Sequence, residues 1–534
     1  MRRPAPLVLI AALLAVGLAP AAEGAMQASK HCAGMNKARV AGAAQQDAPA
    51  CLTDLTTTGL VTTGHTDPSD WATLTSVKTA RQPATPGFQV DGYFPDDSTL
   101  NGEKGKNHDS QFVMRFPDAW NGKLVITGAP GVRKQYSVDR AISDWAVAHG
   151  YAYAATDKGN SGNTFYTDGK APGDAILEWH LRVTQLTVAM KKTVKQVYGR
   201  VPRRTYMTGI SNGGYLTRWA LEHHPDLYDG GVDWEGTLFT PQHNLLTYLP
   251  VALKHYPTYF ATGSRADHDA MIAAGFARGS EPLWNYHYGV YWDLTQRLYR
   301  EELDPSYDGG LSGGVPLCQA GTLPPGTCDA DYVYAHRPKA VKDAIARVSL
   351  TGKIGKPMLT LHGTYDSLLP IKEDSDVYVP MIRKAGKGSM HRYYRIAGGN
   401  HVDQLADDFP ATTRPILPCY YDALVALDAW VTKGAAPPPS GEVPRPVSGD
   451  LANTCDLPKA QAVSAPRPVN QSVNRPVART SDRTAGAAAT AAAAAGSRTT
   501  GGLAATGLSG SVPVVGFGLL IGVVATWRVR SRRG

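Results

Sequence analysis

Two kinds of apolar pattern alternate along the middle of the chain. Residues 111–117 (QFVMRFP) and 123–128 (KLVITG) are short apolar runs, as expected of strands that are covered on both faces. Residues 137–150 begin at a serine and end at a glycine, which predicts a helix, and 151–157 (YAYAATD) predict the next strand. A long amphipathic pattern over 174–199 predicts a second helix. Strands that alternate with helices predict an α/β fold, with a mostly parallel sheet covered by helices on both faces.

The alternation continues past residue 200 and is interrupted once. A strand over 205–209, a helix over 214–224 and a strand-like run over 230–236 follow one another. Residues 241–350 break the rhythm with many aromatic residues and a Gly/Pro-rich stretch, which predicts an inserted lid. The remaining predicted elements are a strand at 356–363, a helix near 372–386, a strand at 391–398 and a helix at 419–434. The segment before residue 111 shows neither the strand pattern nor the helix pattern and is expected to be irregular.

The N-terminal end has the layout of a secretory signal peptide. Two arginines precede an apolar run over 7–16, and small residues follow at Ala19 and Ala21. This run is shorter than the about 20 apolar residues that a membrane-spanning helix needs. Residues 1–22 are therefore expected to be removed on export. The core of the fold would then comprise residues 23–240 and 351–455, on either side of the predicted lid.

The C-terminal end resembles a cell-wall sorting signal of Gram-positive bacteria. Residues 503–534 contain the pentapeptide LAATG, then an apolar stretch, then the basic tail RVRSRRG. The pentapeptide is similar to the LAxTG variant read by class E sortases. This resemblance implies that a sortase cuts between Thr506 and Gly507 and joins the protein to peptidoglycan. A plain C-terminal membrane anchor is the alternative, and both place the protein outside the membrane.

Composition separates the tail from the rest of the chain. Residues 456–502 are rich in Ala, Pro and Arg without helical periodicity, which predicts a disordered linker. The formal net charge of +8 belongs to this linker and the tail, because residues 24–455 contain 42 Lys and Arg against 43 Asp and Glu. The part expected to fold is therefore near neutral. Nothing in this balance indicates nucleic acid as a partner.

The chain has six cysteines, an even number that indicates disulfides in an exported protein. No two of them have the C-x-x-C spacing of a zinc or redox site. Proximity along the chain favours the pairs Cys32–Cys51, Cys318–Cys328 and Cys419–Cys455.

Two serines lie in the pattern G-x-S-x-G, which is typical of a serine nucleophile. Ser211 stands between a predicted strand and a predicted helix, where a tight turn would present its hydroxyl above the sheet. Ser312 stands in a glycine-rich loop with no strand before it. The context therefore favours Ser211 as the nucleophile.

A serine nucleophile needs a base, and the base needs an orienting acid. In a sheet of this type the chain order is Ser, then Asp or Glu, then His. Asp366 follows the strand at 356–363, and His401 lies in a glycine loop after the strand at 391–398. These two residues complete the predicted triad. Asp233 and Glu235 remain alternative acids.

The other histidines near these motifs are assigned no chemistry. His362 is expected to be a loop residue, because Gly363 and Asp366 after it continue the loop that carries the candidate acid. His223 and His224 fall at a helix end, where histidines interact favourably with the helix dipole.

The oxyanion formed by attack on a carbonyl needs two N–H donors. The backbone N–H of Asn212, directly after the nucleophile, is the first expected donor. The second is expected from the loop after residue 128, with Gly131 preferred over Ala129 and Val132. Pro130 has no N–H and is excluded.

The motifs GISNGG, HGTYDSLLP and GGNH, in this order, resemble those of an α/β-hydrolase that extends from residue 111 to about 434. Within that superfamily the chain looks similar to the tannase and feruloyl esterase-like group, on the segments WNGKLVITG, DWAVAHGYAYAATDKGNSG and YDGGV. The resemblance implies serine esterase chemistry. Members of that group carry cysteines where this chain has Ile210 and Val402, so their aromatic-acid substrates are not carried over. No metal is expected, because the lid lacks a dense carboxylate cluster.

These observations together predict a secreted, wall-anchored serine hydrolase that cleaves carboxylic esters through an acyl-enzyme and needs no cofactor. Its expected substrate is a small-molecule or oligomeric ester. The alternatives are a peptidase in which Asp233 or Glu235 binds the substrate amine, a polyhydroxybutyrate-oligomer hydrolase, and a wall-displayed adhesin that kept the fold. The lid aromatics are expected to form the core of the lid, with an acyl pocket as the alternative; they are Trp284, Tyr286, Tyr288, Tyr291 and Trp292.

Overall fold

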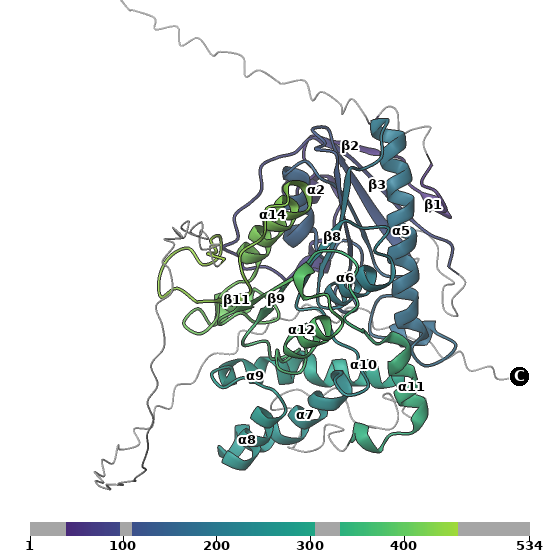
Figure 1. Cartoon of the computed structure of the whole chain (residues 1–534). Coiled ribbons are helices and arrows are strands. Elements are labelled where there is room, and N and C mark those ends of the chain that lie inside the picture. Colours follow the sequence, from purple (N-terminus) through teal and green to yellow (C-terminus); the bar gives the residue numbers. More distant parts are fainter. Residues whose placement is uncertain (1–31, 33–38, 97–108, 305–331, 458–534) are drawn as a thin grey trace, which may run out of the picture. The chain divides into compact units, whose positions relative to one another are not determined.

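The structure is a computed structural model that describes residue 32 and residues 39–96, 109–304 and 332–457 (Figure 1). The predicted signal peptide, the sorting signal with Thr506 and Gly507, and nearly all of the linker lie outside the described residues, as do Ser312, Cys318 and Cys328. Within the described ranges, no helix is long and apolar enough to cross a membrane.

In the described part of the chain, eleven strands form one sheet. They are β1 (Gln45–Gln46), β2 (Ala50–Leu52), β3 (Gly87–Tyr93), β4 (Gln111–Pro117), β5 (Lys123–Gly128), β6 (Ala152–Thr156), β7 (Arg204–Ile210), β8 (Gly230–Trp234), β9 (Met358–Gly363), β10 (His391–Ile396) and β11 (Gly441–Val443). Their order is β1-β3-β4-β6-β5-β7-β8-β9-β10-β11, with β2 also paired to β3. All pairs from β6 to β11 are parallel, and the pairs that involve β3 or β4 are antiparallel.

This sheet confirms the predicted fold class. A mostly parallel mixed sheet, with β5 and β6 exchanged in order and a sharp strand-to-helix turn after β7, is the α/β-hydrolase arrangement. Side chains along a strand alternate between its two faces. Leu124 and Ile126 of β5 accordingly belong to one apolar core, and Val125 between them belongs to the other. Each such buried side chain stabilises the fold by about 1.5–3 kcal/mol.

Helices cover both faces of the sheet. Those of the core are α4 (Asp144–Ala148), α5 (Asp174–Tyr198), α6 (Asn212–His223), α12 (Ser375–Lys384), α13 (Leu405–Asp408) and α14 (Leu417–Lys433), with α2 (Thr57–Thr63), α3 (Pro68–Trp71) and the 3₁₀ turns η3 (Phe165–Asp168) and η6 (Gly388–Met390). Figure 1 shows α5 and α14 on opposite sides of the strands. The side chains of α5 and α6 join one core, and those of α4 and α14 join the other.

The described residues between β8 and β9 contain a group of helices, which is called the insertion here. They are α7 (Leu245–Thr262), α8 (Arg265–Ala273), α9 (Glu281–His287), the π-helix η4 (Tyr288–Trp292), α10 (Asp293–Leu303), the 3₁₀ turn η5 (Tyr334–His336) and α11 (Lys339–Val348). Trp284, Tyr288 and Trp292 are buried, as expected of a core within the insertion, whereas Tyr286 and Tyr291 are half-buried. The indole N–H of Trp292 donates to the backbone oxygen of Ser367 over 2.6 Å, which holds the insertion against the loop that follows β9.

One prediction about the N-terminal part was wrong. The segment before residue 111 is not irregular, because β3 pairs with β4 along its whole length. The polar residue Gln89 interrupts the apolar pattern of β3, so the sequence did not predict this strand. In the structure Gln89 is fully buried and accepts a 2.8 Å hydrogen bond from Arg115 Nε of β4. The helix predicted over 137–150 is present, and its first part is a π-helix, η2 (Asp139–Ser143), that continues as α4.

Two of the expected disulfides are present, Cys32–Cys51 and Cys419–Cys455. The second joins α14 to the segment that follows β11. Because Cys419 is fully buried, this bond fixes that segment directly on one apolar core.

Candidate active site

Ser211 occupies a strained turn between β7 and α6. Its φ of 57° and ψ of −120° are rare for a residue with a side chain. The flanking glycines make the turn possible, because a Cβ on Gly209 would lie 2.5 Å from the backbone of Gly213, and one on Gly213 would lie 2.5 Å from the oxygen of Gly128. Ser211 N–H donates to Trp234 O over 3.0 Å. Strain of this kind persists where surrounding structure fixes it, and it is common at active sites.

Asp366 and His401 are joined by a hydrogen bond at the same edge of the sheet. His401 Nδ1 donates to Asp366 Oδ2 over 2.8 Å. Because β7, β9 and β10 are parallel neighbours or near neighbours, the turns at their carboxyl ends, which carry Ser211, Asp366 and His401, share one edge. The carboxylate of Asp366 accepts the proton on His401 Nδ1, so the lone pair of the neutral imidazole is at Nε2. This is the nitrogen that a general base needs.

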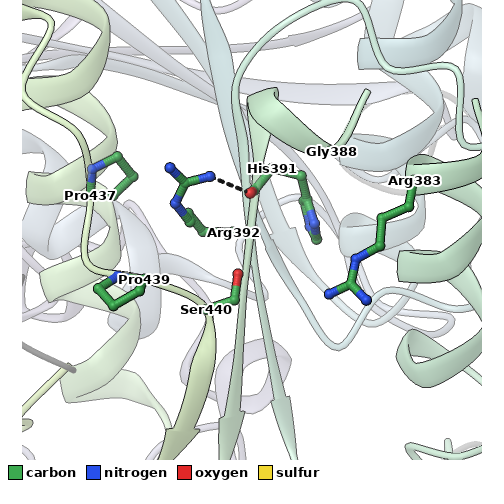
Figure 2. Close-up of a pocket in the computed structure, with 7 residues that line it drawn as sticks. All are labelled: Arg383, Gly388, His391, Arg392, Pro437, Pro439 and Ser440. Carbon is green, nitrogen blue, oxygen red and sulfur yellow. Dashed lines mark hydrogen bonds between the residues drawn. The ribbon is translucent and has the colours of Figure 1, made fainter. Parts of the chain in front are cut away.

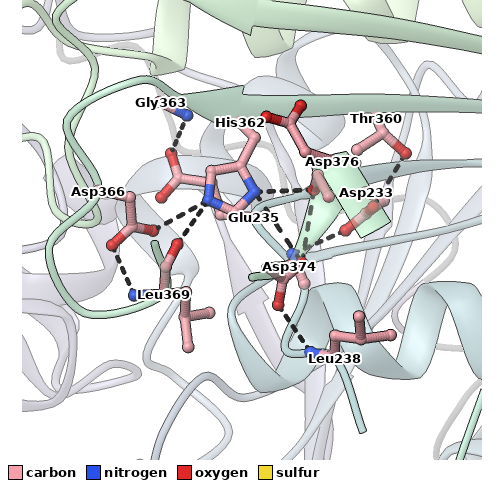
Figure 3. A network of polar contacts seen from close by, with 12 residues as sticks. Asp233, Glu235, Leu238, Thr360, His362, Gly363, Asp366, Leu369, Asp374 and Asp376 are labelled. Carbon is pink, nitrogen blue, oxygen red and sulfur yellow. Dashed lines mark hydrogen bonds and ion pairs between the residues drawn. The ribbon is translucent and has the colours of Figure 1, made fainter. Parts of the chain in front are cut away.

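Asp366 is fully buried, and Figure 3 shows it in contact with His362 and Leu369. Its Oδ1 accepts the backbone N–H groups of Leu368 and Leu369, each over 2.8 Å. Burial raises the pKa of Asp366, but the charge of His401 and hydrogen bonds from His362, His401 and Glu235 outweigh burial and hold the pKa well below its ordinary value. The carboxylate therefore stays ionised in the interior.

His362 is a correction to the sequence analysis. It is not a loop residue but lies within β9, fully buried, with Nε2 2.8 Å from the oxygen of Leu369 and 3.4 Å from Asp366 Oδ2. Burial lowers the pKa of His362, but the hydrogen bond to Asp366 and the charges of Asp366 and Asp374 overcome this effect and raise the pKa to about 9. His362 is thus a buried cation behind Asp366.

The two alternative acids are both fully buried at the end of β8. Asp233 accepts from Arg218 Nε over 2.7 Å, and Arg218 also pairs with Asp374 over 2.7 Å. Glu235 Oε2 lies 3.4 Å from His401 Nδ1, farther than Asp366. Neither carboxyl is exposed to a substrate amine, so the observation that would favour a peptidase is missing.

The loop after β5 lies beside the start of α6. Asn212 is the first residue of α6, and the first amides of a helix have no acceptor within it. Ala129 is eliminated as a second donor, since its N–H donates to Thr156 O over 2.9 Å. Gly131, with a φ of 50°, and Val132 remain. The side-chain amide of Asn212 donates to Gly131 O over 3.1 Å and so ties this loop to the turn at Ser211.

Two residues of the insertion reach the site without any signal in the sequence. The Tyr299 hydroxyl of α10 lies 2.8 Å from Asn212 Nδ2 and 3.0 Å from its Oδ1. His287 of α9 is fully buried, and its Nε2 lies 3.2 Å from Asn400 Oδ1, next to His401. Burial lowers the pKa of His287 to about 4, so it is neutral at ordinary pH. Long sequence separation explains why these contacts were missed.

Among the described residues, two groups of side chains have the spacing of metal ligands. One is Glu235, Asp366 and His401, whose ligand atoms lie within 4.8 Å of one another. The other is Asp96, Asp168 and Glu178. In the second group Arg182 pairs with Glu178 over 2.7 Å and with Asp96 over 3.4 Å, so a guanidinium already supplies positive charge. The absence of a metal stays a prediction.

A separate pocket of about 440 Å³ lies at the opposite, amino end of β10 (Figure 2). The described residues that line it are Arg383, Gly388, His391, Arg392, Pro437, Pro439 and Ser440. Arg392 donates to the neighbouring oxygen of His391 over 2.8 Å and lies over the ring of Trp430. Since His391 begins β10 and His401 follows its end, this pocket is distinct from the site around Ser211.

Comparison with known protein families gives two partial matches. Residues 98–235 match the tannase and feruloyl esterase family, and residues 318–508 match the 3HB-oligomer hydrolase family. The first range contains Ser211 and Glu235, and the second contains Asp366 and His401. Each range is less than half of the chain, and the names of both families are those of hydrolytic enzymes, a tannase and feruloyl esterase in one case and a hydrolase of 3HB oligomers in the other.

Two curated relatives are similar over short regions. A D-(-)-3-hydroxybutyrate oligomer hydrolase of Cupriavidus pinatubonensis is 29% identical over 139 residues, which are 25% of this chain and 20% of the relative. A mono(2-hydroxyethyl) terephthalate hydrolase of Piscinibacter sakaiensis is 28% identical over 145 residues, 24% of each protein. The matched regions thus span a fifth to a quarter of these relatives.

Solved structures with similar folds include two fungal enzymes. Feruloyl esterase B of Aspergillus oryzae has a TM-score of 0.44 and 14% identity, with 77% of this chain and 91% of that chain covered. Tannin acyl hydrolase of Aspergillus niger has a TM-score of 0.45 and 14% identity, with 80% and 94% covered.

Proposed function

We propose that this protein is a serine hydrolase of carboxylic esters, with Ser211 as nucleophile, His401 as base and Asp366 as orienting acid. The observation that carries the proposal is the strained turn at Ser211, set at the same sheet edge as the 2.8 Å hydrogen bond between His401 and Asp366. A serine on such a turn, with a base oriented by a buried carboxylate, is the arrangement that acyl transfer requires.

In the proposed mechanism, Ser211 Oγ attacks the ester carbonyl while His401 Nε2 takes its proton. Asp366 holds the imidazolium through Nδ1, and it keeps its charge because His401 and His362 lower its pKa. The N–H groups of Asn212 and of Gly131 or Val132 stabilise the oxyanion. His401 then protonates the leaving alcohol, and water repeats the sequence on the acyl-enzyme.

The proposed substrates are small or oligomeric carboxylic esters. Both matched families and both curated relatives are named for ester hydrolysis, two of them for hydroxybutyrate oligomers. Hydroxybutyrate oligomers are therefore the first substrates to test. Aromatic esters come second, because this chain has Ile210 and Val402 where the tannase group is expected to have cysteines.

We further propose that the protein is exported and displayed at the cell wall through LAATG and the apolar and basic segments after it. The test is fractionation of cells that express the chain with Leu503→Ala and Thr506→Ala. Loss of the variant from the wall fraction, with recovery in the membranes or the medium, supports sortase attachment, whereas wild type and variant that are both found with membranes support the membrane-anchor alternative.

The activity is tested with purified protein and its Ser211→Ala variant. Each is offered hydroxybutyrate oligomers, feruloyl and galloyl esters, short p-nitrophenyl esters and aminoacyl anilides. Ester turnover that is lost in the variant is the expected result. Turnover that persists in Ser211→Ala would contradict the assignment of the nucleophile, and anilide turnover alone would contradict the assignment to esters.

A further inference from the structure

Glu235 lies against the predicted triad in an unusual backbone conformation. It directly follows β8 and has a φ of 49°, which is uncommon for a residue with a side chain. Its N–H donates to Leu361 O over 2.9 Å, and two residues later Thr237 N–H donates to Ser211 O over 3.2 Å. The strained turn is therefore fixed between β9 and the nucleophile turn.

The two oxygens of Glu235 have different surroundings. Oε1 accepts from Gly363 N–H over 3.2 Å and from the Trp234 indole over 3.3 Å. Oε2 lies 3.4 Å from His401 Nδ1, and among the described residues no group donates a hydrogen bond to it. An oxygen without a donor in a fully buried position is expected to carry the carboxyl proton, with Asp366 as the acceptor.

The charges around Glu235 explain where that proton lies. Asp366 and His362 face it from β9 and the loop beyond, and His401 and Asp403 face it from the loop after β10. Asp403 is held by the N–H groups of Ile416 and Leu417 at the start of α14. Burial first, and then the charge of Asp366, raise the pKa of Glu235 well above its ordinary value. Two carboxylates this close in the interior do not both ionise.

We propose that Glu235 is a positioning residue that shares a proton with Asp366 and can replace it as the acid partner of His401 Nδ1. With Asp366 ionised, Glu235 is neutral and donates to it. When Asp366 is replaced by a neutral residue, the repulsion that kept Glu235 protonated is gone. Glu235 then ionises, and its Oε2, already 3.4 Å away, accepts from His401.

This inference rests on the proposed function, and its test uses isosteric variants. Asp366→Asn keeps an oxygen for the N–H groups of Leu368 and Leu369. Glu235→Gln keeps both the acceptor for Gly363 and a donor for Asp366, but it cannot ionise. Thermal unfolding of each variant checks that it is folded.

Ester hydrolysis is measured across pH for wild type, both single variants and the double variant. A triad acid without a substitute costs about 10⁴-fold in kcat when changed from Asp to Asn. We expect the kcat of Asp366→Asn to fall by only about 10- to 100-fold, which is less than this reference loss. Its activity should rise with pH as Glu235 ionises. Glu235→Gln alone should lose less than about tenfold, and the double variant should fall by about 10⁴-fold with no rise. A full loss in Asp366→Asn, unchanged by adding Glu235→Gln, overturns the proposal.

A second measurement does not depend on activity. The low-field NMR resonance of the His401 Nδ1 proton, assigned by its absence in His401→Gln, should persist in Asp366→Asn and disappear in the double variant. If wild type hydrolyses no ester but the resonance persists in Asp366→Asn and disappears in the double variant, the proposed function fails and the role of Glu235 stands. If wild type is active but the resonance is already absent in Asp366→Asn, the role of Glu235 fails alone.

Discussion

Two buried polar networks lie side by side at the end of the sheet, and they are built on opposite principles (Figure 3). The Arg218 network consists of Arg218, Asp233 and Asp374 and is held by a guanidinium, which never loses its charge. The Glu235 network consists of Glu235, Asp366, His362 and His401, and every member can gain or lose a proton.

The difference shows how a fold can separate rigidity from chemistry. Arg218 bonds Asp233 on β8 and Asp374 just before α12, and Asp374 in turn accepts from Leu238 N–H. These bonds fix the backbone on which Glu235 and the acid loop lie. The Glu235 network can then hold protons that move without a change of structure. The contribution of the first network to stability should therefore not change with pH, whereas the contribution of the second should change with pH, and activity should depend on the second.

The largest expected effect is on activity alone. Ser211→Ala should reduce ester turnover by about 10⁴-fold or more, because the nucleophile is lost. The free energy of unfolding should not fall, because the hydroxyl contributes nothing to the Arg218 network. Hydrolysis rates and urea unfolding of the same preparation measure both. A large loss of stability would show that the Ser211 side chain also contributes to folding.

The next effect is on stability. Arg218→Met leaves the carboxylates of Asp233 and Asp374 buried without a partner and should lower the free energy of unfolding by about 3–5 kcal/mol. Arg204→Met is the matched control, because Arg204 pairs with Asp229 at the surface over 3.6 Å, where a pair contributes about 0–1 kcal/mol. Urea unfolding compares them. Equal losses would contradict the structural role of the Arg218 network.

A third effect is a pH dependence of stability that comes from His362. Its folded pKa of about 9 exceeds the unfolded value of 6.5, so its contribution is fully present below pH 6.5 and is lost as pH rises through 9. The maximum contribution is on the order of 3 kcal/mol. Unfolding of wild type and His362→Gln is compared from pH 6 to pH 9.5. The difference between the two slopes isolates His362, and parallel slopes would show that it is not a cation.

The smallest effect concerns the insertion. Tyr299→Phe removes the hydroxyl that lies against the Asn212 side chain, a neutral hydrogen bond worth about 1 kcal/mol. We expect a loss of up to about fivefold in kcat/KM, with unfolding changed by no more than about 1 kcal/mol. A loss comparable to that of Ser211→Ala would instead place Tyr299 among the residues that act on the substrate.

The elements of the core were predictable because their signals are local. The bounds of β4 and β5 match the apolar runs, and α5 ends one residue before the predicted glycine. The position of Ser211 between a strand and a helix also followed from the pattern, because glycines at 209 and 213 mark a turn that admits no side chain. By contrast, β3 was missed, since its buried Gln89 is satisfied by Arg115, a partner distant in the sequence.

The sequence by itself determined the fold class, the order of the candidate triad and two disulfides, because periodicity and spacing are properties of neighbouring residues. Only the tertiary structure decided the roles of Asp233, Glu235 and His362. Nothing in the residue types of these three positions assigns them a role. Their roles depend on which charged group lies next to each one in the folded protein. Asp233 faces an arginine, and Glu235 and His362 face Asp366. Glu235 and Asp366 are far apart in the chain, and even the nearer pairs Arg218–Asp233 and His362–Asp366 become buried interactions only when the sheet has formed.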